Sequence, residues 1–189
     1  MQLDYNILQK RDVQRIESQT LQLNKARFDQ YELISNVIAD YKNQLIKEKE
    51  ITINLLRKSN AMSTTVNVDK NRLLQVIYNL LDNAIKFKGE GTISIKISGS
   101  DNNSDAITVS VKDTGSGIDV DLLPRLFSKF VTKSFQGTGL GLFICKGIIE
   151  THGGKIWAEN NKDVEGATFT FTLPIQVPIN DNNYSKTSN

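Results

Sequence analysis

A chain of 189 residues suits one folded domain with short appendages, and its 39% hydrophobic and 23% charged residues suit a globular protein with a core. The net charge of +2 comes without basic clusters, so we expect no nucleic-acid partner. The single cysteine, Cys145, excludes an internal disulfide and fits a reducing compartment, so we expect this segment to be cytoplasmic. No apolar stretch approaches the roughly 20 residues that span a bilayer, which leaves membrane anchoring of a longer parent protein open.

The N-terminal part predicts two helices and two short strands. Residues 2–19 are polar without a helix breaker, which predicts an exposed helix that would be marginal alone. After a polar break at residues 24–27, Asp29 and Glu32 have the spacing of a capping box, so a helix should run from there to about residue 49. Residues 51–56 and 64–68 are short runs typical of strands.

A long helix and a hairpin are predicted next. Asp69 is the expected N-cap of a helix that continues to about residue 87. Residues 92–98 and 107–111 alternate apolar and polar side chains, which predicts an antiparallel pair of strands. Residues 119–136 indicate short helical pieces and loop.

The C-terminal part predicts a further helix over residues 138–151, which HGG (152–154) ends as a glycine C-cap. Residues 155–159 and 167–173 predict two more antiparallel strands. Together the elements favour an α+β two-layer sandwich, with a mixed, mostly antiparallel sheet of about five strands and about three helices on one face.

Polar residues form one stripe on the helix predicted at residues 72–87. At about 100° per residue they occupy a wedge opposite the apolar side chains: Arg72, Gln75, Asn79, Asp82, Asn83 and Lys86. A solvated face explains such a stripe, but mid-helix Asn is a poor helix former. Asn79, Asn83 and Lys86 share one line along the helix. An amide oxygen suits Mg²⁺ that phosphate already balances, and a lysine one turn further neutralises phosphate.

Two glycine-rich segments follow the helix. DTGSGI (113–118) continues from a strand and fits either a simple turn or a base-binding corner. In the second interpretation the Asp113 carboxylate accepts the adenine amine, and Gly115 and Gly117 let the backbone approach a flat base. GTGLGL (137–142) precedes a helix, so it either presents backbone N–H groups to phosphate or allows tight helix packing. It fits neither the P-loop nor the dinucleotide-binding pattern.

The stretch between these loops, residues 126–136, contains two phenylalanines and a polar continuation. Phe127 and Phe130 are expected to anchor the stretch in the core. The polar part is expected to act as a mobile lid over a ligand. Lys133 is either a phosphate contact or an exposed loop lysine.

In combination, these motifs resemble the N, G1, F and G2 boxes of sensor histidine kinases. The catalytic domains of these kinases share a Bergerat-type ATP-binding fold with type II topoisomerases, heat-shock chaperones and mismatch-repair proteins. The resemblance covers about residues 28–174, and NLLDNAIKF, LFSKF and THGGKIWAEN favour the kinase branch.

The resemblance implies ATP and Mg²⁺ as cofactors and assigns roles to individual residues. Asn83 would ligate Mg²⁺, Asn79 would help to hold the triphosphate, and Lys86 would contact phosphate. Asp113 would bind the adenine amine, and Thr168 in GATFTF matches a strand Thr that helps to hold adenine, often through water. The base would lie against Gly115, Gly117 and Ile118, and the phosphates against Gly137, Thr138, Gly139, Leu140 and Gly141.

The sequence departs from the superfamily pattern at two places. Topoisomerases have a water-activating Glu where Asn79 stands, and an amide cannot act as a general base. We therefore expect slow ATP hydrolysis and transfer of the phosphoryl group to a positioned acceptor. The lid between Phe130 and Gly137 is short for the family, which implies weaker nucleotide binding.

Histidine kinases phosphorylate a histidine on a preceding dimerisation domain, and this sequence contains no candidate acceptor. Its only histidine, His152, belongs to the THGG segment of the ATP domain, where a structural role is expected. We therefore interpret residues 1–20 as the end of a dimerisation helix, 21–175 as the catalytic domain and 176–189 as a disordered tail. The implied partners are the upstream phosphoacceptor domain, a response regulator and a second copy of the parent.

Three alternatives stay open at this level. A chaperone- or topoisomerase-type ATPase is disfavoured by Asn79 and by the absence of a transducer domain. A nucleotide-free interaction module is disfavoured by Asn83, Asp113 and both glycine loops. A protein serine kinase of the anti-sigma-factor type would share the fold.

Overall fold

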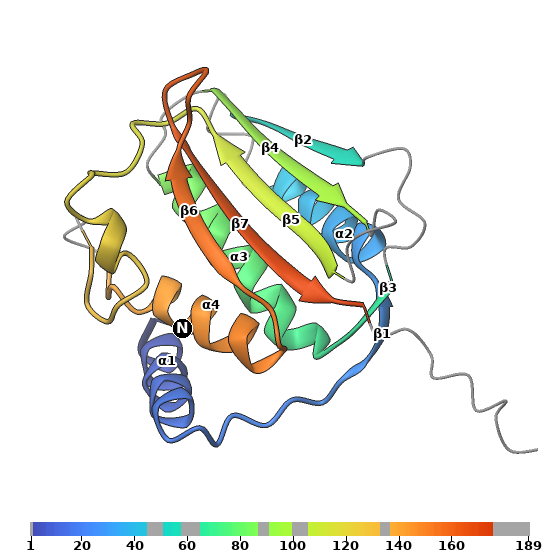
Figure 1. The fold of residues 1–189 in the computed structure, drawn as a ribbon, viewed down its shortest axis with the longest axis vertical. Helices are drawn as coiled ribbons and strands as arrows, with labels where there is room; N and C mark the ends of the chain where they lie inside the picture. Colours follow the sequence, from blue (N-terminus) through green and yellow to red (C-terminus); the bar gives the residue numbers. More distant parts are fainter. Residues whose placement is uncertain are drawn as a thin grey trace, which may run out of the picture.

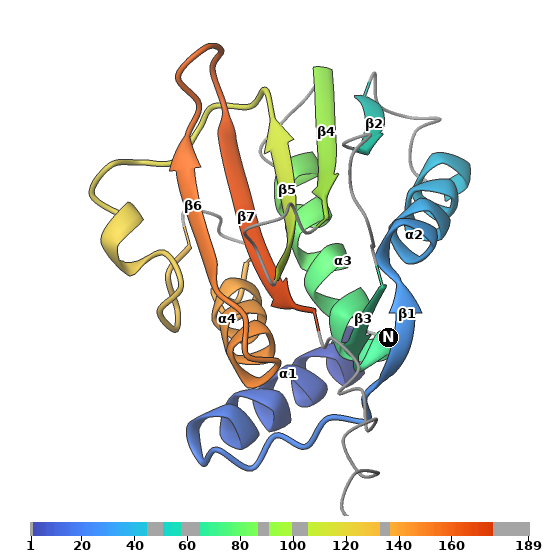
Figure 2. The same ribbon diagram turned by 45° about the vertical axis from the view of Figure 1, so that its right-hand side comes forward.

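The computed structural model describes residues 2–44, 51–57, 65–86, 91–99, 106–132 and 137–175. Within these ranges a five-stranded sheet packs against helices, and the N-terminal helix lies beside the last of them (Figures 1 and 2). The elements are α1 (Gln2–Glu17), β1 (Ala26–Asp29), α2 (Gln30–Gln44), β2 (Ile51–Arg57), β3 (Thr65–Val68), α3 (Lys70–Lys86), β4 (Gly91–Ser98), β5 (Ala106–Asp113), the 3₁₀ turn η1 (Leu123–Arg125), α4 (Gly141–Thr151), β6 (Ile156–Asn160) and β7 (Ala167–Pro174).

The main sheet has the strand order β2-β4-β5-β7-β6. Only the β2–β4 pair is parallel, and the other three pairs are antiparallel. The predicted pairing of residues 92–98 with 107–111 is confirmed, with Ile95 opposite Val111. The mixed, mostly antiparallel sheet predicted from the sequence is therefore confirmed.

Alternation along the central strands buries one face of this sheet. Along β5 every second residue is buried, and the same period holds over most of β4. The buried side chains pack with the apolar side of α3, which lies between α2 and α4. Burial of each large aliphatic side chain contributes about 1.5–3 kcal/mol. The side chains at the centre of this core are Leu73, Val76, Ile77, Leu80, Leu81, Ile93, Ile95, Ile97, Ile107, Val109 and Val111.

A second, two-stranded sheet was not expected from the sequence. The predicted break at residues 24–27 is wrong at its end, because Ala26–Asp29 forms β1 and pairs antiparallel with β3. Phe28 lies opposite Val66 in this pair. Four residues are too short for a readable alternation, so only the contact with β3 defines the strand.

Both predicted helix caps are confirmed. The Asp29 carboxylate accepts hydrogen bonds from the backbone N–H of Tyr31 (2.7 Å) and Glu32 (3.2 Å) at the start of α2. At the start of α3, Asp69 Oδ1 accepts from the N–H of Arg72 (3.1 Å) and Oδ2 from the N–H of Asn24 (2.9 Å). Asp69 therefore caps α3 and also anchors the segment that follows α1.

The start of α4 differs from the prediction. The helix begins at Gly141, three residues after the predicted start at residue 138. Gly139 has φ +67°, a left-handed backbone that ends helical geometry before the first turn. The predicted end at HGG is confirmed, with His152 as C-cap and Gly153 at φ +84°.

His152 joins the end of α4 to the start of α3. The buried ring accepts a hydrogen bond at Nε2 from the backbone N–H of Asp69 (3.0 Å). Nδ1 therefore carries the proton and donates it to the carbonyl oxygen of Ile148 (2.8 Å). This is a structural role, in agreement with the sequence interpretation.

Two of the predictions from the sequence concern residues that the structure does not describe. Lys133 and the predicted tail at residues 176–189 lie outside the described residues. Among the residues that are described, no helix is both long and apolar enough to cross a bilayer.

The neutral form of His152 predicts a loss of stability in acid. Burial lowers the pKa of His152 below its usual 6.5; Lys25 acts in the same direction and Asp69 opposes it. Protonation therefore favours the unfolded chain. The contribution is fully present above pH 6.5 and falls below it by at most about 1.4 kcal/mol per pH unit. Urea unfolding between pH 5 and 8 should show a smaller pH dependence for His152→Gln than for the unaltered chain. Parallel curves would contradict this role.

Candidate functional site

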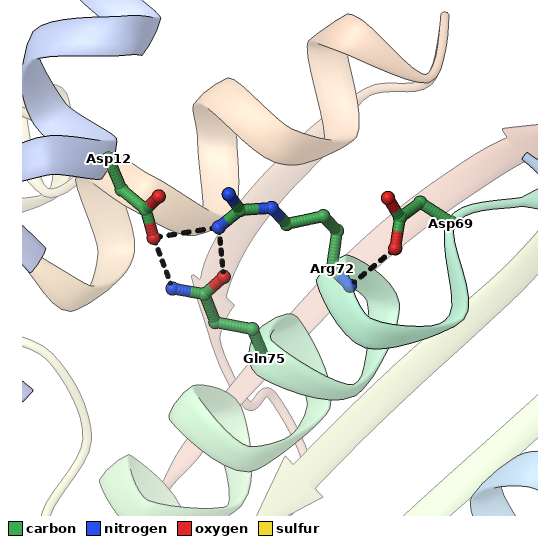
Figure 3. Close-up of polar contacts among 4 residues, drawn as sticks. All are labelled: Asp12, Asp69, Arg72 and Gln75. Atoms are coloured by element: carbon green, nitrogen blue, oxygen red, sulfur yellow. Dashed lines mark hydrogen bonds and ion pairs between the residues drawn. The ribbon is translucent and has the colours of Figure 1, made fainter. Parts of the chain in front are cut away.

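The polar stripe of α3 divides between two surroundings. Its first part, with Arg72 and Gln75, faces α1 (Figure 3). Its second part, with Asn79, Asn83 and Lys86, lines a cavity of about 530 Å³. In the sequence these polar residues form one continuous helix face. In the structure, one part of this face contacts α1 and the other part lines a cavity of the size of a ligand pocket.

The cavity lies where four segments meet. Its walls come from α3, the loop after β5, the loop before α4 and the start of β7, with one contribution from α1. The residues around it are Gln9, Asn79, Asp82, Asn83, Lys86, Asp113, Ser116, Gly117, Ile118, Asp119, Leu122, Leu126, Val131, Thr132, Gly137, Thr138, Gly139, Gly141, Leu142, Ala167 and Phe169.

Most of the site residues predicted from the sequence meet in this cavity. Those that line it are Asn79, Asn83, Lys86, Asp113, Gly117, Ile118, Gly137, Thr138, Gly139 and Gly141. Three do not: Gly115 and Leu140 are buried residues of the two loops that do not line the cavity, and Thr168 donates its hydroxyl to Asn161 Oδ1 (2.7 Å). Lys133 lies in an undescribed segment.

Asp113 ends the central strand β5 and turns its carboxylate towards the cavity. The residue is buried, and Oδ1 accepts hydrogen bonds from the backbone N–H of Gly115 (2.8 Å) and Ala167 (3.3 Å). Within the described ranges no group donates to Oδ2. A buried carboxylate with one oxygen tied and one available is suited to accept a hydrogen bond from a ligand N–H.

The loop before α4 is shaped by a close backbone contact. Gly139 lies so near the start of the lid segment that a Cβ there would come within 2.6 Å of the carbonyl carbon of Phe130. The Gly139 carbonyl accepts the N–H of Phe130 (3.0 Å). Together with its positive φ, this contact requires glycine.

The two phenylalanines of residues 126–136, the segment predicted to include a lid, differ in environment. Phe127 packs against the core, as predicted. Phe130 is 72% exposed with φ +64°, so its predicted place in the core is wrong. The backbone pairing with Gly139 turns Phe130 outwards, a contact that hydrophobicity alone does not reveal.

Helix α1 contacts the site at a residue that sequence reasoning missed. Gln9 is 4% exposed, lines the cavity and accepts a hydrogen bond at Oε1 from the hydroxyl of Thr138 (2.9 Å). Nothing in the polar sequence around Gln9 distinguishes it from solvent-exposed neighbours.

A buried ionic contact fixes α1 on α3. Asp12 Oδ2 accepts hydrogen bonds from Arg72 Nη1 (2.8 Å) and Gln75 Nε2 (2.9 Å), and Arg72 also donates to Gln75 Oε1 (2.9 Å) (Figure 3). At the other end of α1, Lys129 forms an ion pair with Glu17. Helix α1 is thus held by the N-terminal half of α3 and by Lys129 in the segment that precedes α4.

The α3 wall of the cavity contains side-chain oxygen atoms that can ligate a metal ion. The amides of Asn79 and Asn83 lie along it with the carboxylate of Asp82, whose Oδ1 accepts the hydroxyl of Tyr41 (2.6 Å). The described residues contain no cluster of three or more His, Cys, Asp or Glu side chains suited to a metal. Such a donor set fits Mg²⁺ whose remaining ligands are phosphate oxygens and water.

Cys145 is excluded as a nucleophile. It lies on α4, fully buried, and burial raises the pKa of its thiol to about 12. The thiol therefore stays protonated at neutral pH and packs as a small apolar group.

Comparison with known proteins places this geometry in a family. Residues 68–177 match the family of histidine kinase-, DNA gyrase B- and HSP90-like ATPases. Phytochrome-like protein Cph1 of Synechocystis sp. is 38% identical over 165 residues, which are 85% of this chain and 21% of that protein. Sensor histidine kinase RcsC of Escherichia coli is 34% identical over 170 residues, 87% of this chain and 17% of that protein. The chain therefore spans about a fifth of these relatives.

Solved structures with a similar fold are histidine kinases. The nucleotide-free catalytic domain of histidine kinase ThkA has a TM-score of 0.70 and 35% identity, covering 80% of this chain and 95% of that one. Full-length ShkA in complex with AMPPNP has a TM-score of 0.75 and 27% identity, covering 90% and 36%. ThkA in complex with the response regulator TrrA has a TM-score of 0.70 and 31% identity, covering 91% and 48%.

The buried contact between α1 and α3 should contribute measurable stability. The Asp12 and Arg72 side chains are only 9% and 20% exposed, so a double-mutant cycle with Asp12→Asn and Arg72→Gln should give a coupling energy of about 1–3 kcal/mol in urea unfolding. The Lys146–Glu150 pair on α4 is the control. Those side chains are 46% and 56% exposed at 3.8 Å, so their coupling should stay below about 0.5 kcal/mol. Equal coupling in both pairs would contradict the contact.

Proposed function

The chain belongs to the family of histidine kinase-, DNA gyrase B- and HSP90-like ATPases as a histidine kinase catalytic domain, and from this premise we propose that it positions ATP·Mg²⁺ for phosphoryl transfer to a histidine outside this chain. The observation that carries the proposal is one cavity with a carboxylate at one side and two Asn residues and a lysine at another. Its volume of about 530 Å³ falls within the range of ligand pockets, roughly 300–1,000 Å³.

In the proposed complex, adenine lies against the loop after β5. Asp113 Oδ2 accepts the exocyclic amine, and Gly117 and Ile118 lie beside the ring. Gly115 acts indirectly, because its N–H orients the Asp113 carboxylate. The phosphates would extend towards the N-terminus of α4, where Gly137, Thr138, Gly139 and Gly141 line the cavity and their backbone N–H groups would bind them.

The α3 wall would hold the metal and the phosphates. Asn83 would ligate Mg²⁺, with Asn79 beside the triphosphate and Lys86 as its cationic partner. When bound, Mg²⁺ neutralises charge on the transferring phosphoryl group. Lys133 is a further proposed phosphate contact from the lid. Asn79 cannot deprotonate water, so the site favours transfer to a positioned acceptor over hydrolysis.

The remaining assignments concern the parent protein. We propose residues 1–20 as the end of a dimerisation helix, residues 21–175 as the catalytic domain, and a cytoplasmic location for both. The docking of α1 beside the cavity through Gln9 and Asp12 supports this division. The proposed partners are a response regulator, by analogy with the ThkA–TrrA complex, and, from the sequence resemblance alone, a phosphoacceptor domain and a second copy of the parent.

Replacement of one carboxylate oxygen should weaken nucleotide binding. Asp113→Asn keeps an oxygen for the N–H groups of Gly115 and Ala167 but presents an amide N–H₂ to the adenine amine. ADP affinity in the presence of Mg²⁺ should fall by about 10- to 150-fold, the effect of losing a charged hydrogen bond. Isothermal titration measures it. Asp163→Asn, at an exposed ion pair with Lys112, should bind ADP like the unaltered chain. Equal loss in both variants would contradict the role of Asp113.

The isolated chain should bind ATP without labelling itself. Its only histidine is buried and hydrogen-bonded at both ring nitrogens, so it offers no free acceptor. Incubation with γ-labelled ATP and Mg²⁺ should leave no acid-labile label on the chain. A dimerisation domain with an acceptor histidine, added in trans, should become labelled. Acid-labile label on the isolated chain would refute the proposal.

A further inference from the structure

The end of β6 contacts the proposed adenine loop through two consecutive asparagines. Asn160 Oδ1 accepts the backbone N–H of Ile118 (2.7 Å), and its Nδ2 donates to the Ile118 carbonyl oxygen (2.7 Å). One side chain thus pairs with both backbone groups of one residue, as a neighbouring strand would. The backbone at Ile118 is thereby fixed in position and orientation.

The second asparagine fixes the other end of the same loop. Asn161 Nδ2 donates to the carbonyl oxygen of Asp113 (2.8 Å), and its Oδ1 accepts the hydroxyl of Thr168 (2.7 Å). Its own backbone N–H donates to the carbonyl oxygen of Gly166 (2.9 Å). Both side-chain polar groups of Asn161 are therefore used to connect β6 and β7 to the start of the loop.

The loop between these anchors has little freedom of its own. Gly117 has φ +73°, and a Cβ there would come within 3.0 Å of Asn160 Oδ1. The Asn160 amide thus packs directly on the residue beside Ile118. Neither asparagine lines the cavity, so any effect on a ligand is transmitted through the loop backbone.

We propose that Asn160 and Asn161 are positioning residues for base recognition, which hold Asp113 and Ile118 at the separation that an adenine ring requires. The proposal rests on the proposed function, because it assumes that adenine binds this loop. Ordering a backbone residue costs about 1–2 kcal/mol, so a loop ordered before binding removes that cost from the ligand. Thr168 enters the same arrangement as the support of Asn161.

The test compares two nucleotides that differ in the base. Asn160→Ala and Asn161→Ala should each weaken ADP binding about tenfold, the size expected for losing a pair of ordering hydrogen bonds. In GDP a carbonyl oxygen stands at the ring position of the adenine 6-amine that Asp113 would accept, and the guanine amine lies elsewhere, at C2. GDP should therefore bind more weakly than ADP to the unaltered chain, its affinity should change little in the variants, and the ADP-to-GDP affinity ratio should narrow. Glu159→Ala, an exposed residue on the same strand, should retain the original ratio.

A second measurement needs no nucleotide. The Ile118 amide hydrogen should exchange with solvent faster in Asn160→Ala than in the unaltered chain, while amides in the centre of β5 should not change. Faster exchange with a narrowed ADP-to-GDP ratio supports the positioning role. A lowered melting temperature with an unchanged ratio would show a merely structural role and overturn the inference.

The two proposals fail in different ways. No ADP binding by the unaltered chain would overturn the proposed function and the inference with it. If the unaltered chain binds ADP, and either asparagine variant has the same ADP affinity and the same base preference, the inference alone is overturned.

Discussion

Burial of the apolar face of α3 against the central strands sets the rotation of that helix, and the polar chemistry of the molecule depends on this rotation. Leu80, Leu81 and Ala84 are almost fully buried, so the opposite side must face away from the sheet. Turning the helix by one residue would move Asp82 or Asn83, which are not buried, towards the core, where an unpaired polar group costs free energy. The hydrophobic core therefore holds the polar stripe in register with the two glycine loops.

The start of α3 is a junction of separate segments. Asp69 accepts the N–H groups of Arg72 and Asn24, and its own N–H is bound by His152 at the end of α4. The helix that carries the proposed metal and phosphate contacts is thus connected at one point to the segment that follows α1 and to the end of α4. A buried histidine, an aspartate cap and backbone groups satisfy one another there, as buried polar groups must.

The cavity is built from elements that differ in how they are held. The α3 wall belongs to the core, whereas the loop after β5 relies on side chains from β6 and the loop before α4 relies on backbone contact with Phe130. Helix α1 adds Gln9 at the edge. A change in the docking of α1 would therefore reach Thr138 directly, through a single hydrogen bond.

The sequence predicted the elements whose pattern is long and local. Amphipathic α3, the alternating strands β4 and β5, and the caps at Asp29 and Asp69 follow from periodicity and from contacts within one helical turn. The glycine loops could be recognised because chain reversal and close approach restrict those positions to few residue types. Most proposed ligand contacts were accordingly found in the cavity.

The amino-acid sequence by itself determined the polar stripe of α3, the fold class and the identity of the two loops. Only the tertiary structure decided that Arg72 and Gln75 face α1 while Asn79 and Asn83 face the cavity. Only the tertiary structure shows that β1 pairs with β3, that Phe130 is exposed, and that the Thr168 hydroxyl donates a hydrogen bond to Asn161. The physical reason is that these outcomes depend on partners distant in the chain. A single polar residue carries no local signal of whether its hydrogen bonds go to water, a ligand or a remote backbone group.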